Sequence, residues 1–302
     1  DQPRSRGLGD VYKRQSLSPG RFSHAIPNPS SKKIIICGLN ELHINKIYPT
    51  THAVLGDAEI TLRALTNELR SKTSGQGISN QDQLDKIEQQ RNEDKIIYQE
   101  AMNSSDMPVN PYRVYSDMMK ALDPNNSFVT HESGNTRDQL STVYETVIPR
   151  GFLGWGNVSS LGFSLPAAMA AKIAFPHRRS VAVTGEAGLG YMLGNLEVPV
   201  REKIGITVVH ISNGGFSGYG PGFWGEGHDP YTHKVLNYET VDMSKAIEQL
   251  GFHSERVSDP NDIIPALERA FSANEQGQPS YIEIICSQYP IYGGWVTGTH
   301  GE

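Results

Sequence analysis

Two stretches of this sequence decide its fold: SVAVTGEAGLG at residues 180–190 and ITVVHISNGG at residues 206–215. Each begins with a run of apolar and β-branched residues, which predicts a buried strand, and each strand is followed directly by glycine and polar residues. A helical stretch separates the two. Strands that alternate with helices predict an α/β fold whose parallel sheet is flanked by helices.

The same alternation continues along the chain on both sides of these stretches. Further strands are predicted at 127–130 and 281–286, and helices at 111–122, 241–250 and 263–273. Ligands of parallel α/β sheets bind at the carboxyl ends of the strands. The polar segments that follow predicted strands are HESGN at 131–135, GEAGLG at 185–190 and SNGG at 212–215. We expect these three segments to converge in one site.

The chain before residue 107 is organised differently. Residues 1–15 have no periodicity and look like translated adapter sequence, so we interpret them as a non-native segment. Residues 16–75 contain a short apolar strand and a helix that Asp57 could cap; a resemblance described below implies that they are a partial second α/β domain at the N-terminus. Residues 76–106 are predicted to be a linker and connecting helix, 107–290 the main domain, and 291–302 a loose tail.

Composition narrows the classes of function. Of the 302 residues, 37% are hydrophobic and 20% charged, as in ordinary globular proteins, and the net charge of -6 argues against a nucleic-acid partner. No apolar stretch approaches the roughly 18 residues of a membrane span, and no secretory signal is visible. We therefore expect a cytoplasmic protein without a membrane partner. Cys37 and Cys286 each lie in an apolar run, which predicts buried strand cysteines.

The loop GEAGLG favours a phosphate, because glycines after a strand and before a helix let an anion approach the backbone. A dinucleotide fingerprint is the obvious alternative. Its order is G-x-G-x-x-G, however, and the next predicted strand ends in Ser212 and Asn213, without the acid that would hold a ribose. A nicotinamide-dependent Rossmann enzyme is therefore the weaker hypothesis.

Glu186 is out of place beside a diphosphate unless a cation lies between them. Mg²⁺ takes oxygen ligands and is usually shared between carboxylates and phosphates. Glu186 can supply a carboxylate, Asn213 an amide oxygen, and the backbone beyond Asn213 a carbonyl. Taken singly, the two residues are typical of a surface acid and a turn former. Their positions at the ends of neighbouring strands favour a metal site.

GEAGLG and SNGG together resemble the thiamine-diphosphate motif of acetolactate-synthase-like enzymes, in which GDG is followed at a fixed distance by NN. Glu186 and Asn213 lie 27 positions apart, the spacing of the Asp and the second Asn in that family. The resemblance implies a thiamine-diphosphate-binding fold, with Mg²⁺ held by Glu186, Asn213 and the carbonyl of Gly215. The cofactor-binding residues implied in the first loop are Gly185, Glu186, Ala187 and Gly188.

Two further segments carry the resemblance. WGNVSSLGFSLPAAMAAKIA at 155–174 is similar to the family segment ending in a GFGLPAA-like string. It implies that Leu161 wedges under the thiazolium and bends the cofactor, and that the carbonyl of Ser159 accepts from the 4′-amino group. Without the family, Leu161 would indicate core packing. HESGN matches the loop near the diphosphate, which implies Ser133 and Gly134 as cofactor-binding residues.

The segment KIYPTTHAVLGDAEITLRALTNEL at 46–69 resembles the end of the family's middle domain, so 16–75 is interpreted as the C-terminal remnant of that domain. In the family, the glutamate that activates the cofactor belongs to a pyrimidine-binding domain that precedes it. No catalytic residue is therefore assigned in this chain, and we expect the isolated chain to be inactive. FAD is an option for the full-length protein that nothing in this chain supports.

The implied function is a thiamine-diphosphate-dependent decarboxylase or carboligase that acts on a small 2-oxo acid or acyl substrate, in a homo-oligomer of two or four subunits. Alternatives are a 2-hydroxyacyl-CoA lyase or benzaldehyde-lyase type of enzyme, and a non-catalytic relative that only binds the cofactor. The sequence departs from the motif at Glu186 for Asp, Ala187 for Gly and Ser212 for Asn. The first and last of these changes support the non-catalytic alternative.

Weaker candidates lie near the same strand ends. His131 could transfer protons beside a bound cofactor, but for both His131 and His210 a structural role is favoured. The aromatic residues of the loop that follows the metal segment could wall a substrate pocket or pack the loop onto the core. They are Phe216, Tyr219, Phe223 and Trp224.

Overall fold

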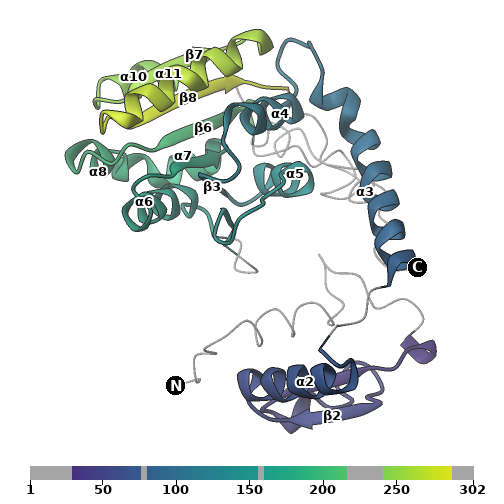
Figure 1. Cartoon of the computed structure of the whole chain (residues 1–302). Coiled ribbons are helices and arrows are strands. Elements are labelled where there is room, and N and C mark those ends of the chain that lie inside the picture. The colour runs from purple at the N-terminus through teal and green to yellow at the C-terminus, as the bar shows by residue number, and fades with distance from the viewer. Residues whose placement is uncertain (1–28, 76–79, 156–159, 216–240, 288–302) are drawn as a thin grey trace, which may run out of the picture. The chain divides into compact units, whose positions relative to one another are not determined.

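The computed structural model describes residues 29–75, 80–155, 160–215 and 241–287. The described residues divide into two compact units, one ending at Ile87 and the other beginning at Glu88 (Figure 1). This division lies in α3 (Gln81–Met102), within the segment 76–106 that the sequence predicts as linker and connecting helix. The predicted segments 1–15 and 291–302 lie outside the described residues.

The first unit is a small α/β structure. Strands β1 (Ile35–Gly38) and β2 (His52–Leu55) pair in parallel, and helix α2 (Ala58–Lys72) follows. Short 3-10 helices, η1 (Pro29–Ser31) and η2 (Glu41–His43), flank β1. The Asp57 carboxylate caps α2 by accepting from the N–H groups of Glu59 and Ile60, as the sequence predicts. No residue of α2 is buried, so the apolar stripe of this helix remains exposed.

The second unit is built on a parallel six-stranded sheet in the order β4-β3-β5-β6-β8-β7 (Figure 1). This sheet confirms the predicted α/β fold class. The strands in chain order are β3 (Ser127–His131), β4 (Phe152–Leu153), β5 (Arg179–Thr184), β6 (Thr207–Ser212), β7 (His253–Val257) and β8 (Ser280–Ile285).

Successive residues of a strand point to opposite faces of the sheet, and here they belong to two different apolar clusters. Helices therefore cover both faces. Val209 and Ile211 of β6 belong to one cluster, which includes residues of α4 (Pro111–Ala121), α5 (Asn135–Val143) and α11 (Ile263–Glu275). Val208 belongs to the other cluster, which draws on three more helices. These are α6 (Ser164–Ala174), α7 (Glu186–Met192) and α10 (Met243–Glu248). The remaining elements are η3 (Leu193–Asn195), α8 (Glu197–Arg201) and η4 (Pro260–Asp262).

The two cysteines differ in their surroundings. Cys286 is buried as predicted, and burial raises the pKa of its thiol. Cys37 is only partly buried, which corrects the prediction of a buried cysteine: the small unit leaves much of β1 open. Neither forms a disulfide in the described chain. No helix in the described ranges combines the length and apolar character that crossing a membrane requires.

Candidate cofactor and metal site

The three polar segments predicted to converge do lie at one edge of the sheet. Strands β3, β5 and β6 are consecutive in the strand order, and all are parallel, so their carboxyl ends are neighbours. Glu132 and Ser133 follow β3, Gly185 follows β5, and Asn213 follows β6. This edge is where ligands of parallel α/β sheets bind.

Glu186 is the first residue of α7, and its carboxylate reaches the segment after β6. Its Oε1 accepts from the backbone N–H of Asn213 at 2.6 Å and from that of Gly214 at 2.8 Å. The structure therefore brings the Glu186 carboxylate against the backbone of Asn213, the residue 27 positions away that is the other metal-ligand candidate. The Oδ1 of Asn213 accepts from the N–H of Gly215 at 3.3 Å, which joins these two candidate ligands in one compact turn.

The electrostatics of Glu186 suit a cation. Burial raises the pKa of this carboxyl to about 7, against the lowering effect of backbone N–H groups, and the charge of nearby Glu283 raises it further. None of the described Lys, Arg or His side chains pairs with it. A divalent cation would supply the missing positive charge, and carboxylate, amide and carbonyl oxygens are the donors that Mg²⁺ prefers. The residues present therefore fit this ion.

Two helices begin at the same edge and present backbone N–H groups to it. Helix α5 starts directly after Gly134, and α7 starts directly after Gly185. Thr136 connects them: its methyl group lies 3.7 Å from the place where a side chain on Gly185 would begin. The buried Oγ1 of Thr136 has no hydrogen-bond partner among the described residues, so it is a ready donor for a bound anion. Sequence reasoning missed Thr136.

Glu132 is a second residue that sequence reasoning missed. It is 1% exposed, and its two carboxylate oxygens accept from the N–H groups of Gly162 at 2.9 Å and Ser164 at 2.6 Å. These bonds fix the turn that carries Leu161, which is partly buried at the start of α6. The sequence signal was an acid placed directly after a buried strand. Ser159 lies outside the described residues.

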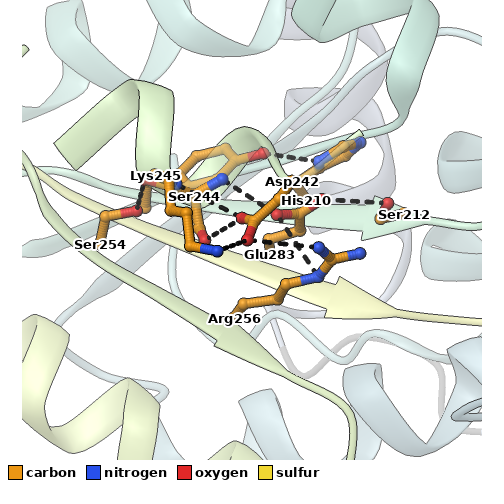
Figure 2. Close-up of polar contacts among 9 residues, drawn as sticks. His210, Ser212, Asp242, Ser244, Lys245, Ser254, Arg256 and Glu283 are labelled. Atoms are coloured by element: carbon orange, nitrogen blue, oxygen red, sulfur yellow. Dashed lines mark hydrogen bonds and ion pairs between the residues drawn. The ribbon is translucent and has the colours of Figure 1, made fainter. Parts of the chain in front are cut away.

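Ser212 stands where the family motif has its first Asn, and it contacts a buried glutamate. Its Oγ donates to Glu283 of β8 at 3.3 Å, and the N–H of Ser244 donates to the same carboxylate at 3.0 Å. Figure 2 shows Glu283 between these residues, with Nε of Arg256 3.9 Å away. Burial raises the pKa of Glu283. This buried carboxylate, also missed from the sequence, fixes the strand end that leads into the metal segment.

Both histidines near the site are buried. The Nδ1 of His131 lies 3.0 Å from the carbonyl oxygen of Glu132, and burial lowers its pKa. The Nδ1 of His210 lies 2.6 Å from the hydroxyl of Tyr281, and burial lowers the pKa of His210 to about 3. These contacts support the structural role favoured from the sequence. The aromatic residues at 216–224 lie outside the described residues.

Comparison with known proteins agrees with this geometry. The family model "Thiamine pyrophosphate enzyme, C-terminal TPP binding domain" matches residues 132–284, which contain every described candidate ligand. The dinucleotide hypothesis is therefore wrong. A probable acetolactate synthase large subunit of Methanocaldococcus jannaschii is 26% identical over 193 residues, or 61% of this chain and 31% of that protein.

Other relatives cover more of the chain. A 2-hydroxyacyl-CoA lyase of Arabidopsis thaliana is 25% identical over 263 residues, which are 85% of this chain and 45% of that protein. An acetolactate synthase large subunit of Mycobacterium tuberculosis is 25% identical over 251 residues, or 81% of this chain and 42% of that protein. The chain spans less than half the length of these relatives. It belongs to the thiamine pyrophosphate enzymes and carries their C-terminal cofactor-binding domain.

Proposed function

We propose that this chain forms the thiamine diphosphate- and Mg²⁺-binding part of a 2-oxo acid decarboxylase or carboligase resembling acetolactate synthase. The observation that carries the proposal is the contact between the Glu186 carboxylate and the backbone of Asn213 and Gly214. That contact joins a carboxylate, which pairs with no Lys, Arg or His side chain among the described residues, to the residue that carries the candidate amide ligand. Both residues lie in the stretch that matches the family's cofactor-binding domain.

Each part of the edge has a distinct task in this proposal. The side chains of Glu186 and Asn213, with the Gly215 carbonyl, would hold Mg²⁺. The hydroxyl of Thr136 and the N–H groups at the start of α5 would face the diphosphate. Leu161 would support the rings of the cofactor. When bound, thiamine diphosphate supplies the carbon nucleophile and the electron sink for breaking a bond beside a carbonyl group.

A 2-hydroxyacyl-CoA lyase is the second candidate. The Arabidopsis lyase and the mycobacterial synthase are each 25% identical to this chain, over 85% and 81% of its length, so sequence similarity supports the two activities about equally. The two candidates can be separated by comparing turnover of a 2-oxo acid with turnover of a 2-hydroxyacyl-CoA. Both rates are measured on the chain combined with the preceding domains of a relative. A non-catalytic relative would bind cofactor and turn over neither.

Calorimetric titration of the chain with thiamine diphosphate, with and without Mg²⁺, tests the proposal. We expect Mg²⁺-dependent binding that Glu186→Gln weakens about tenfold or more, because the variant removes the charged ligand. Glu197→Gln is the matched control, since Glu197 is exposed and, among the described residues, forms its ion pair with Arg201 on the same helix, α8. Failure of the wild-type chain to bind the cofactor, or equal effects of the two substitutions, would contradict the proposal.

A further inference from the structure

Glu132 is a buried carboxylate that has no place in the proposed ligand set. It is 1% exposed and follows β3 directly, and its own N–H donates to the carbonyl of Val183 in β5 at 2.9 Å. In the described chain it forms no ion pair. A carboxylate buried in this way needs strong hydrogen-bond donors, and backbone N–H groups provide them here.

The first of its contacts is the turn that leads into α6. Phe163 occupies the N-cap position of this helix but provides no side-chain cap. Glu132, at the end of β3, caps the helix instead. Its Oε2 accepts from the N–H of Gly162 at 2.9 Å, and its Oε1 accepts from the N–H of Ser164 at 2.6 Å. Gly162 has a φ of 84°, a left-handed conformation that suits glycine. The turn, and Leu161 with it, is therefore fixed by one carboxylate.

The second contact is with α7, the helix that begins at Glu186. A Cβ atom on Gly188 would lie 2.3 Å from Cγ of Glu132 and 2.7 Å from Oγ1 of Thr184. The aliphatic part of Glu132 therefore lies directly against the backbone of α7, two residues after the proposed metal ligand. Glycine at 188 is what permits this approach.

We propose that Glu132 is a positioning residue that holds the Leu161 turn against α7, so that the ring end and the diphosphate end of the cofactor meet one preorganised unit. The proposal rests on the thiamine diphosphate site proposed above. Glu132 acts through the turn and not through the metal, so its loss should disturb the ring end of the cofactor and leave the diphosphate end intact.

Two probes separate these ends. Inorganic pyrophosphate with Mg²⁺ reports on the diphosphate end alone, whereas thiamine diphosphate with Mg²⁺ reports on both ends. Glu132→Gln keeps the size of the side chain but offers one acceptor where the turn needs two, and its amide N–H₂ faces a backbone N–H. We expect this variant to weaken thiamine diphosphate about tenfold and to change pyrophosphate affinity less than twofold. Glu197→Gln should change neither.

A double-mutant cycle with Leu161→Ala tests whether Glu132 acts through the turn. In the Leu161→Ala background, Glu132→Gln should have little further effect on thiamine diphosphate affinity. Glu132→Asp retains the charge but is too short to reach both N–H groups. If Glu132→Gln folds poorly, Glu132→Asp should show the same pattern, with weaker binding of thiamine diphosphate and nearly unchanged binding of pyrophosphate. Unfolding midpoints and far-ultraviolet circular dichroism identify any variant that is misfolded.

The outcomes distinguish this inference from the proposed function. If the wild-type chain binds neither probe, the thiamine diphosphate site fails, and the role of Glu132 fails with it. If the wild-type chain binds both, the role alone is overturned by any of three results. The first is that the Glu132 variants bind thiamine diphosphate as tightly as the wild type. The second is that they lose affinity for thiamine diphosphate and for pyrophosphate equally. The third is that Glu132→Gln and Leu161→Ala have additive effects on thiamine diphosphate affinity.

Discussion

Glu186 and Glu132 are both mostly buried carboxylates that accept backbone hydrogen bonds, but they use their oxygen atoms differently. The N–H groups of Asn213 and Gly214 both donate to Oε1 of Glu186. Each oxygen of Glu132 accepts one backbone N–H. An arrangement with one donor on each oxygen suits a residue that holds a turn. Glu186 instead fixes the segment after β6 through Oε1, and we propose that the same carboxylate binds the cation.

Gly188 is the residue at which a single methyl group should be most disruptive. Its added Cβ would meet Glu132 at 2.3 Å, whereas no atom of the described residues lies within 4 Å of a Cβ on Gly190, in the same helix. We expect Gly188→Ala to destabilise the protein by about 1–3 kcal/mol through overpacking. Gly190→Ala, the matched control, should stabilise it by about 0.5–1 kcal/mol. Urea unfolding measures both, and similar effects of the two substitutions would contradict the contact with Glu132.

His210 should make the stability of the fold depend on pH. Burial lowers its pKa to about 3 from an ordinary value of 6.5, so the unfolded chain binds the proton more readily. Stability from this group is therefore present above pH 6.5 and is lost as the pH falls. Between pH 6.5 and 5.5 the free energy of unfolding should fall by about 1 kcal/mol more in the wild type than in His210→Gln. Parallel pH profiles would contradict this.

At the scale of elements, most helices were predicted more closely than the edge strands, although α5 was not predicted. Polar caps and apolar spacing mark α2 and α4, and Asn110 caps α4 by accepting from Tyr112 N–H. β7 was missed because it consists of mostly polar residues, HSERV, and lies at the edge of the described sheet, paired with β8. Its Glu255 pairs with Arg269 of α11, a contact that no local pattern reveals.

The cap of α2 gives a test at this scale. Asp57→Ala should cost about 1 kcal/mol, because two N–H groups at the start of the helix lose their acceptor. Amide hydrogen exchange at Glu59 and Ile60 should speed up accordingly. Asp57→Asn should retain slow exchange, since asparagine is an equally good cap. If alanine and asparagine gave the same exchange rates, the cap would not hold the helix end.

For the molecule as a whole, the sequence was sufficient to predict the parallel sheet and the convergence of three loops. Runs of apolar residues indicate the buried strands. Ligands of parallel α/β sheets bind at the carboxyl ends of such strands, so the loops that follow the strands can be assigned to one site. The supports of the site were not predictable in the same way. Glu132 lies 30 residues from Gly162, and Ser212 lies 71 residues from Glu283. Such hydrogen bonds depend on strand order and side-chain direction, which spacing along one chain does not encode.

The central claim, that Glu186, Asn213 and Gly215 hold a divalent cation beside a diphosphate, can be tested by placing a paramagnetic ion in the site. Mn²⁺ prefers the same oxygen ligands as Mg²⁺ and broadens the nuclear magnetic resonance signals of nearby amides. With thiamine diphosphate present, the amide signals of Glu186, Asn213 and Gly215 should broaden first, and those of α8 should stay sharp. Broadening centred elsewhere, or at no defined position, would contradict the account.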